Sequence, residues 1–109
     1  MTTPEGKVRD PVVTWAKQNG FLHFRMSFRP GVRQGTPDDL FIAPGGLHVW
    51  VEFKRNGKEP TPLQSERLAT LINHGVAAFW ANDKDDAIAA LQRVLNFATL
   101  AMAKGGAPN

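Results

Sequence analysis

The chain of 109 residues contains no cysteine. This absence excludes a disulfide scaffold, a thiol nucleophile and a cysteine-ligated zinc or iron–sulfur site. Long hydrophobic runs are also absent, since the longest apolar run is only a few residues and a membrane-spanning helix needs about 18. The N-terminal sequence, MTTPEGKVRD, has no apolar secretory core. We therefore expect a cytoplasmic protein without a membrane partner.

The composition is close to that of an average globular chain, with 42% hydrophobic and 21% charged residues. We expect a single domain over residues 1–103 and a disordered tail over 104–109. The net charge of +3 permits a polyanionic partner without establishing one. Cations and acids stand side by side in the middle third of the chain, which suits a site for both a metal ion and a phosphate. These residues are Arg25, Arg29, Arg33, Asp38, Asp39, Glu52, Lys54, Arg55 and Lys58.

Apolar residues at three- and four-residue steps predict a first helix between Thr3 and Gly20. These residues are Val8, Val12, Trp15 and Ala16. Pro11 either kinks this helix or begins a new one, and we expect one kinked helix. Asp83 caps a last helix that runs to about Ala98. Its expected inner face consists of Ile88, Leu91, Leu95 and Ala98.

The middle helix has three agreeing start signals. Thr61 suits the N-cap, Pro62 the first turn and Gln64 the third position of a capping box. Gly75 ends this helix, and its expected buried face consists of Leu68, Leu71 and Ile72.

Alternation predicts a half-buried strand over Phe21–Phe28. On that strand Leu22, Phe24, Met26 and Phe28 point one way, and His23, Arg25 and Ser27 point the other. Leu40–Ala43 and Leu47–Arg55 form a hairpin across a Pro-Gly-Gly turn, and Val76–Ala81 is a short buried strand. The predicted order α-β-β-β-α-β-α implies a mixed sheet flanked by helices, and therefore an α/β fold.

The most informative residues are Asp38, Glu52 and Lys54. Because side chains alternate along a strand, Glu52 and Lys54 share one face of the sheet. Asp38 precedes the neighbouring strand of the hairpin, so its carboxylate comes within one metal ion's reach of Glu52. Two carboxylates and a backbone carbonyl suit Mg²⁺ with several retained waters. Such a metal and a lysine supply what phosphodiester hydrolysis needs, which is an activated water and stabilisation of negative charge.

Asp38 followed by Glu52-Phe53-Lys54 resembles the PD-(D/E)xK nuclease motif. More narrowly, Gly-Thr-Pro-Asp at 35–38 and the downstream Gln64 resemble the VRR-NUC (virus-type replication-repair nuclease) family, over nearly the whole chain. The resemblance implies a restriction-endonuclease-like αβββαβ core. It also implies Mg²⁺- or Mn²⁺-dependent cleavage of DNA, often branched DNA such as four-way (Holliday) junctions, by a phage or bacterial protein. No small-molecule cofactor is expected.

Carried over by position, the resemblance makes Asp38, Glu52 and the Phe53 carbonyl the metal ligands and Lys54 the catalytic lysine. Glu5 would approach the metal directly or through water, and Gln64 would orient Lys54 or a phosphate. Asp39 follows Asp38 directly, and the sequence alone leaves both as candidates; we favour Asp38 because Asp39 would point to the opposite side of the strand.

Each of these assignments has a plainer interpretation. Glu5 is also a favourable first-turn charge on a helix, and Gln64 is also a capping-box partner. Four loop cations flank the expected site and are candidates for binding DNA, or are ordinary solvated charges. They are Arg29, Arg33, Arg55 and Lys58.

We expect a homodimer, since a domain this small has little surface for recognising a junction. The alternative to an endonuclease is a non-catalytic or partner-dependent DNA-binding module on a nuclease fold.

Overall fold

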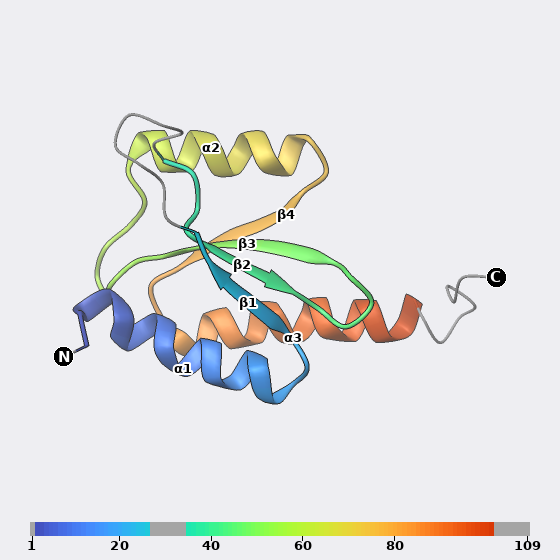
Figure 1. Ribbon diagram of the computed structural model, residues 1–109. Helices are drawn as coiled ribbons and strands as arrows, with labels where there is room; N and C mark the ends of the chain where they lie inside the picture. The colour runs from blue at the N-terminus through green and yellow to red at the C-terminus, as the bar shows by residue number, and fades with distance from the viewer. Residues whose placement is uncertain (1, 27–34, 102–109) are drawn as a thin grey trace.

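The computed structural model describes residues 2–26 and 35–101. Three helices and four strands follow one another in the predicted order α-β-β-β-α-β-α (Figure 1). The elements are α1 (Pro4–Gln18), β1 (Leu22–Arg25), β2 (Asp39–Ile42), β3 (His48–Phe53), α2 (Pro62–Asn73), β4 (Ala77–Ala81) and α3 (Lys84–Ala101). The tail expected over 104–109, and the part of the first predicted strand beyond Met26, lie outside the described residues.

The four strands form one sheet in the order β1-β2-β3-β4. The pairs β1/β2 and β2/β3 are antiparallel, whereas β3 and β4 run parallel. The predicted hairpin between β2 and β3 is therefore confirmed, and so is the mixed sheet. The parallel pair is joined through α2, because a parallel connection has to cross over from one end of the sheet to the other.

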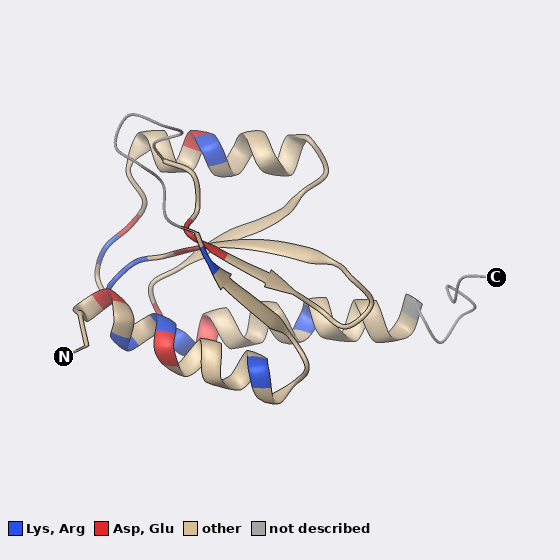
Figure 2. Cartoon of the chain, in the orientation of Figure 1, with Lys and Arg blue, Asp and Glu red and all other residues tan. Residues whose placement is uncertain are grey.

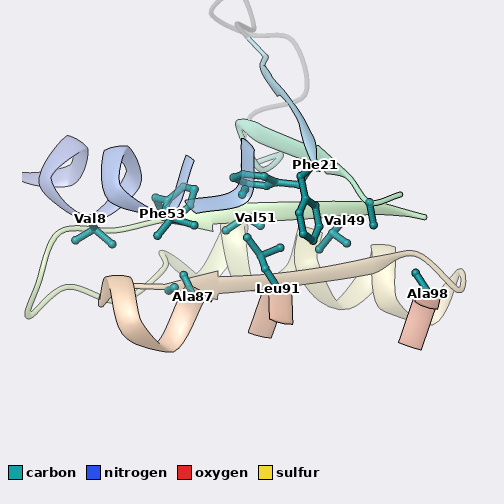
Figure 3. Close-up of a cluster of buried hydrophobic side chains, with 13 residues drawn as sticks. Val8, Phe21, Val49, Val51, Phe53, Ala87, Leu91 and Ala98 are labelled. Carbon is teal, nitrogen blue, oxygen red and sulfur yellow. The ribbon is translucent and has the colours of Figure 1, made fainter. Parts of the chain in front are cut away.

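The hydrophobic core lies between one face of the sheet and the helices α1 and α3, which pack against each other. Figure 1 shows α2 on the opposite side of the sheet, where it contacts β4. Side chains of alternate residues of β3 enter this core, as Figure 3 shows for Val49, Val51 and Phe53, and Leu91 of α3 meets them. No helix in the described ranges has both the length and the apolar character needed to cross a membrane.

Helix α1 begins where Thr3 accepts a hydrogen bond from the backbone N–H of Gly6 through its hydroxyl. The helix continues through Pro11 as a single element, and the proline is exposed. It ends at Asn19, before Gly20 with a φ of 85°. The expected single helix is thus confirmed, and Glu5 lies in its first turn.

The apolar side chains of β1 do not face the core. Leu22 is 58% exposed and Phe24 is 49% exposed, whereas His23 is partly buried and stacks near Phe41 with ring centroids 4.7 Å apart. Phe21, just before the strand, is buried at 3%. Helix α1 packs on the side of β1 that carries His23. Leu22 and Phe24 point to the opposite face of the sheet, where α2 contacts β4, the strand at the other edge.

Helix α2 begins with the predicted capping box: Thr61 accepts from the backbone of Gln64, and Gln64 accepts from the backbone N–H of Thr61. Leu68 is buried as expected, but Ile72 is 54% exposed, so its assignment to the buried face was wrong. Helix α2 packs on the edge strand β4, and Ile72 lies on the exposed side of the helix.

Candidate active site

Two carboxylates meet where β2 begins and β3 ends. In the antiparallel register Asp39 pairs with Val51, so one step further Asp38 comes opposite Glu52. Both residues belong to the sheet face opposite the core, because Asp39, Val51 and their alternate neighbours face the helices α1 and α3. The negative charge of Asp38 contributes to the raised pKa of Glu52.

Glu52 is buried, with only 5% of its surface exposed, so it is not an ordinary solvated residue of a strand. Burial raises the pKa of its carboxyl to about 7; the charge of Lys54 opposes this rise, and those of Asp38 and Glu5 add to it. The pKa of Asp38 is raised as well, mainly by burial and then by Asp39 and Glu5. Several acids thus lie close together with too few cations to balance them, and a bound cation would stabilise their ionised carboxylates.

Lys54 forms an ion pair with Glu52, with its Nζ 3.9 Å from Oε2. Its backbone N–H donates to the carbonyl of Ala81, the last residue of β4. The end of the parallel strand pair therefore fixes the backbone of Lys54, and its ammonium group reaches back over the carboxylate.

Glu5 and Lys54 line a cleft of about 480 Å³ between the first turn of α1 and the β3–α2 connection. The cleft is also lined by Thr3, Pro4, Arg55, Lys58, Glu59 and Thr61. Figure 2 shows basic and acidic residues gathered where this connection passes the N-terminal end of α1. The structure thus brings Glu5, Lys54, Arg55 and Lys58 to one place, and Glu5 is close enough to Glu52 to influence its pKa.

Asp39 is fully buried on the core side, where it has two partners. Its Oδ2 accepts from Arg9 Nε at 3.0 Å, and its Oδ1 lies 2.7 Å from His23 Nε2. Of the two consecutive aspartates, only Asp38 is therefore directed to the side of Glu52.

Gln64 lies at the start of α2, where its side-chain carbonyl is used by the capping box. Phe53 places its ring in the core at 1% exposure, directly between Glu52 and Lys54 in the chain. Two of the cations expected to bind DNA, Arg29 and Arg33, lie outside the described residues.

The residues present fit a divalent cation that keeps much of its water. Within the described ranges, no group of three or more histidine or acidic side chains is placed to hold a metal ion. Asp38 and Glu52 would instead supply two carboxylates, and the Phe53 carbonyl a third oxygen, with water completing the shell. Mg²⁺ is commonly bound in this way, through one or two carboxylates and several waters.

The nuclease motif does not identify two residues that lie near this site, Arg9 and His23. Arg9 is 3% exposed, and its Nη2 lies 2.6 Å from Glu5 Oε2. His23 binds Asp39 as described above. A signal for Arg9 exists in the sequence, since it stands four residues after Glu5 and on the same stripe as Val12 and Ala16. His23 has no such signal, because its partner lies on another strand.

Gly35, the first residue of the Gly-Thr-Pro-Asp segment, is required by its backbone. Its φ is 85°, and a Cβ atom there would lie 2.8 Å from Leu63 Cγ and 3.1 Å from Arg67 Cγ, both on α2. The segment leading to Asp38 therefore lies directly against α2, and a side chain at residue 35 would push the two apart.

We expect Gly35→Ala to lower the free energy of unfolding by about 2–3 kcal/mol in urea denaturation, since left-handed strain costs about 1–2 kcal/mol and the contact with α2 adds to it. Gly75→Ala is the matched control, with a φ of 82° and nothing within 4 Å of the added Cβ. It should lose only the strain. Equal losses in the two variants would show that the contact with α2 has no energetic effect.

No family model matches the chain. Among curated proteins, it is 32% identical over 71 residues to "Putative nuclease p44" of Acyrthosiphon pisum secondary endosymbiont phage 1, which covers 65% of this chain and 74% of that protein. Two solved structures share the fold. One, described as "VRR_NUC domain", superposes with a TM-score of 0.75 at 25% identity, over 84% of this chain and 97% of the other. The second, "VRR_NUC domain protein", gives 0.68 at 27% identity, over 84% and 88%. The order of elements, the mixed sheet and these relatives agree, and the chain belongs to the VRR-NUC family of nucleases.

Proposed function

We propose that this protein is a divalent-metal-dependent DNA endonuclease that hydrolyses phosphodiester bonds and prefers branched DNA such as four-way junctions. The observation that carries the proposal is the half-buried Asp38 opposite the buried Glu52, with Lys54 beside Glu52 and lining a cleft together with Arg55 and Lys58. Two neighbouring carboxylates repel each other when both are ionised, and a cation bound between them would remove this repulsion and take part in catalysis.

In this proposal Asp38, Glu52 and the Phe53 carbonyl hold Mg²⁺, and Mn²⁺ also supports activity. The bound metal would polarise a phosphate oxygen and lower the pKa of a water molecule. Lys54 would orient the attacking water and stabilise the negative charge that develops on the phosphate. Glu5, at the edge of the cleft, would bind the metal directly or through water. Gln64 would orient Lys54 or a phosphate with its amide group, while its carbonyl caps α2.

The cleft supplies the contacts to the DNA backbone. Arg55 and Lys58 line it beside Lys54, and these three cations would contact the phosphates of DNA bound there. Such contacts position DNA without reading its sequence. Arg29 and Arg33 remain proposed DNA contacts on the basis of the sequence.

We also propose that two copies associate, so that two sites act on one branched substrate. The sheet face that carries Glu52 has an apolar row across three strands, in which Phe24, Leu40 and Trp50 pair in register. Phe24 is 49% exposed and Trp80, on the adjacent strand, is 38% exposed. Exposed apolar residues gathered on one face of a sheet are typical of a binding surface.

A charge at the exposed β1 end of this row should separate the copies. We expect the wild type to elute at twice its 12.0 kDa mass in size-exclusion chromatography with light scattering, and Phe24→Lys to elute as a monomer. Phe97→Lys is the control, because Phe97 is 65% exposed on α3, away from this row. A monomeric wild type would contradict the dimer, and a dimer broken only by Phe97→Lys would move the contact to α3.

The function is tested by incubating the purified protein with labelled linear duplex, flap and four-way-junction DNA, in EDTA, Mg²⁺ and Mn²⁺. We expect internal cuts that require a metal and that are fastest on the junction. Faster cleavage of the linear duplex or the flap would overturn the junction preference and leave the nuclease in place. Binding of the junction without cleavage in any metal would favour the alternative, a DNA-binding module that is non-catalytic or depends on a partner.

A further inference from the structure

We propose that Arg9 is a positioning residue, which holds the Glu5 carboxylate at the cleft by one oxygen and so presents the second oxygen to the water shell of the cation proposed at Asp38 and Glu52. The inference rests on the proposed metal-dependent activity and concerns a residue outside the nuclease motif.

The contacts of Arg9 have the form expected for this task. Its Nη2 donates to Glu5 Oε2 at 2.6 Å, and its Nε donates to Asp39 Oδ2 at 3.0 Å, so one rigid guanidinium bridges α1 and β2. Among the described residues Glu5 Oε1 has no hydrogen-bond partner, and the Glu5 side chain is 35% exposed. One oxygen of Glu5 is therefore fixed and the other is available.

The guanidinium is itself held by Asp39 and by the ring of Phe53. Asp39, whose other oxygen lies 2.7 Å from His23 Nε2, anchors it from the strand. Its Cζ lies 5.4 Å from the centre of the Phe53 ring. Burial lowers the pKa of Arg9, but the charges and hydrogen bonds of Asp39 and Glu5 outweigh that effect and raise it, so the side chain stays charged. Because these contacts fix the rotamer of Arg9, the side chain can hold Glu5 in one orientation.

A purely structural role explains only part of this arrangement. Buried ion pairs contribute little net stability compared with apolar packing, and one carboxylate would satisfy the charge of Arg9. Here the second carboxylate, Glu5, lies at the cleft with Lys54, and its charge reaches Asp38 and Glu52. The chain from His23 through Asp39 and Arg9 to Glu5 thus connects the core to the acidic pair.

A double-mutant cycle tests the inference, with direct Mn²⁺ binding, measured by the electron paramagnetic resonance of free Mn²⁺, as the readout. Arg9→Lys keeps the charge but cannot donate to Glu5 and Asp39 in the same fork geometry. We expect Arg9→Lys and Glu5→Gln each to weaken Mn²⁺ binding by about 10-fold, the lower end for groups that orient metal ligands. The double variant should also weaken it by about 10-fold, because both changes remove one interaction. Arg93→Lys, an exposed arginine on α3, is the matched control and should bind Mn²⁺ as the wild type does.

Two results would overturn the inference. A loss of about 100-fold in the double variant would mean that Arg9 and Glu5 act independently. A lower melting temperature in Arg9→Lys with unchanged Mn²⁺ binding would mean that Arg9 only stabilises the fold.

A second measurement needs no variant at Arg9. A Mn²⁺-bound crystal structure of the wild type should keep Arg9 Nη2 within hydrogen-bond distance of Glu5 Oε2, with Glu5 Oε1 on a water molecule of the ion. Glu5 turned away from Arg9 there would overturn the inference. If the wild type cleaves DNA with Mn²⁺ but the cycle is additive, only this inference fails. If the wild type neither binds Mn²⁺ nor cleaves DNA, the proposed function fails with it.

Discussion

Glu52→Gln should reduce the rate of DNA cleavage at least about 1,000-fold while leaving the affinity for DNA within a few-fold of the wild type. The substitution keeps the shape of the side chain and removes the negative charge that would hold the cation. Metal ions contribute several kcal/mol to such reactions, and about 4 kcal/mol corresponds to about 1,000-fold. Cleavage rates under single-turnover conditions and binding measured in Ca²⁺ or EDTA check the two parts separately.

Glu66→Gln provides the matched control, since Glu66 is an exposed glutamate on α2. This variant should cleave at the rate of the wild type. Retention of more than about a tenth of the activity in Glu52→Gln would show that Glu52 does not hold the metal and that the acidic pair has another role.

The second large effect is on stability and depends on pH. In the unfolded chain the pKa of Glu52 is 4.5, whereas in the folded protein it is about 7. Between these values the unfolded chain has lost a proton that the folded protein still holds, so the free energy of unfolding falls as pH rises. The stabilising contribution is complete below about pH 4.5 and is lost as the pH passes 7. With about 1.4 kcal/mol per pKa unit, the loss is on the order of 3 kcal/mol.

Urea denaturation between pH 4.5 and pH 8 measures this effect. Glu52→Gln should match the wild type near pH 4.5 and exceed its stability by on the order of 3 kcal/mol at pH 8. Saturating Mg²⁺ at pH 8 should return much of the difference to the wild type, since the ion binds the carboxylate form. Parallel pH profiles for the two proteins would contradict the raised pKa of Glu52. An inactive but more stable variant would also exclude unfolding as the reason for its inactivity.

The sequence predicts the elements that build this site better than it predicts how they are oriented. The hairpin and the capping box of α2 depend on local signals, namely a Pro-Gly-Gly turn and the run from Thr61 to Gln64, and both are present in the structure. Strand alternation also separates Asp38 from Asp39 correctly, because neighbouring side chains on a strand point to opposite faces.

What the sequence does not predict depends on contacts between distant segments. Alternation in β1 shows that Leu22 and Phe24 share a face, but not which face the helices cover, and the buried face proved to be the one with His23. The burial of Arg9 likewise depends on Asp39, which lies 30 residues away. The φ of Gly35 follows from the path of its segment along α2.

The most direct test of the proposed metal site at Asp38 and Glu52 is the position of a bound cation. Crystals grown with Mn²⁺ and measured at a wavelength where manganese scatters anomalously would locate the ion independently of the protein atoms. We expect a single strong peak between the carboxylates of Asp38 and Glu52, within about 2.0–2.3 Å of an oxygen of each. An empty Asp38–Glu52 pair at saturating Mn²⁺, or a peak on other residues only, would contradict it.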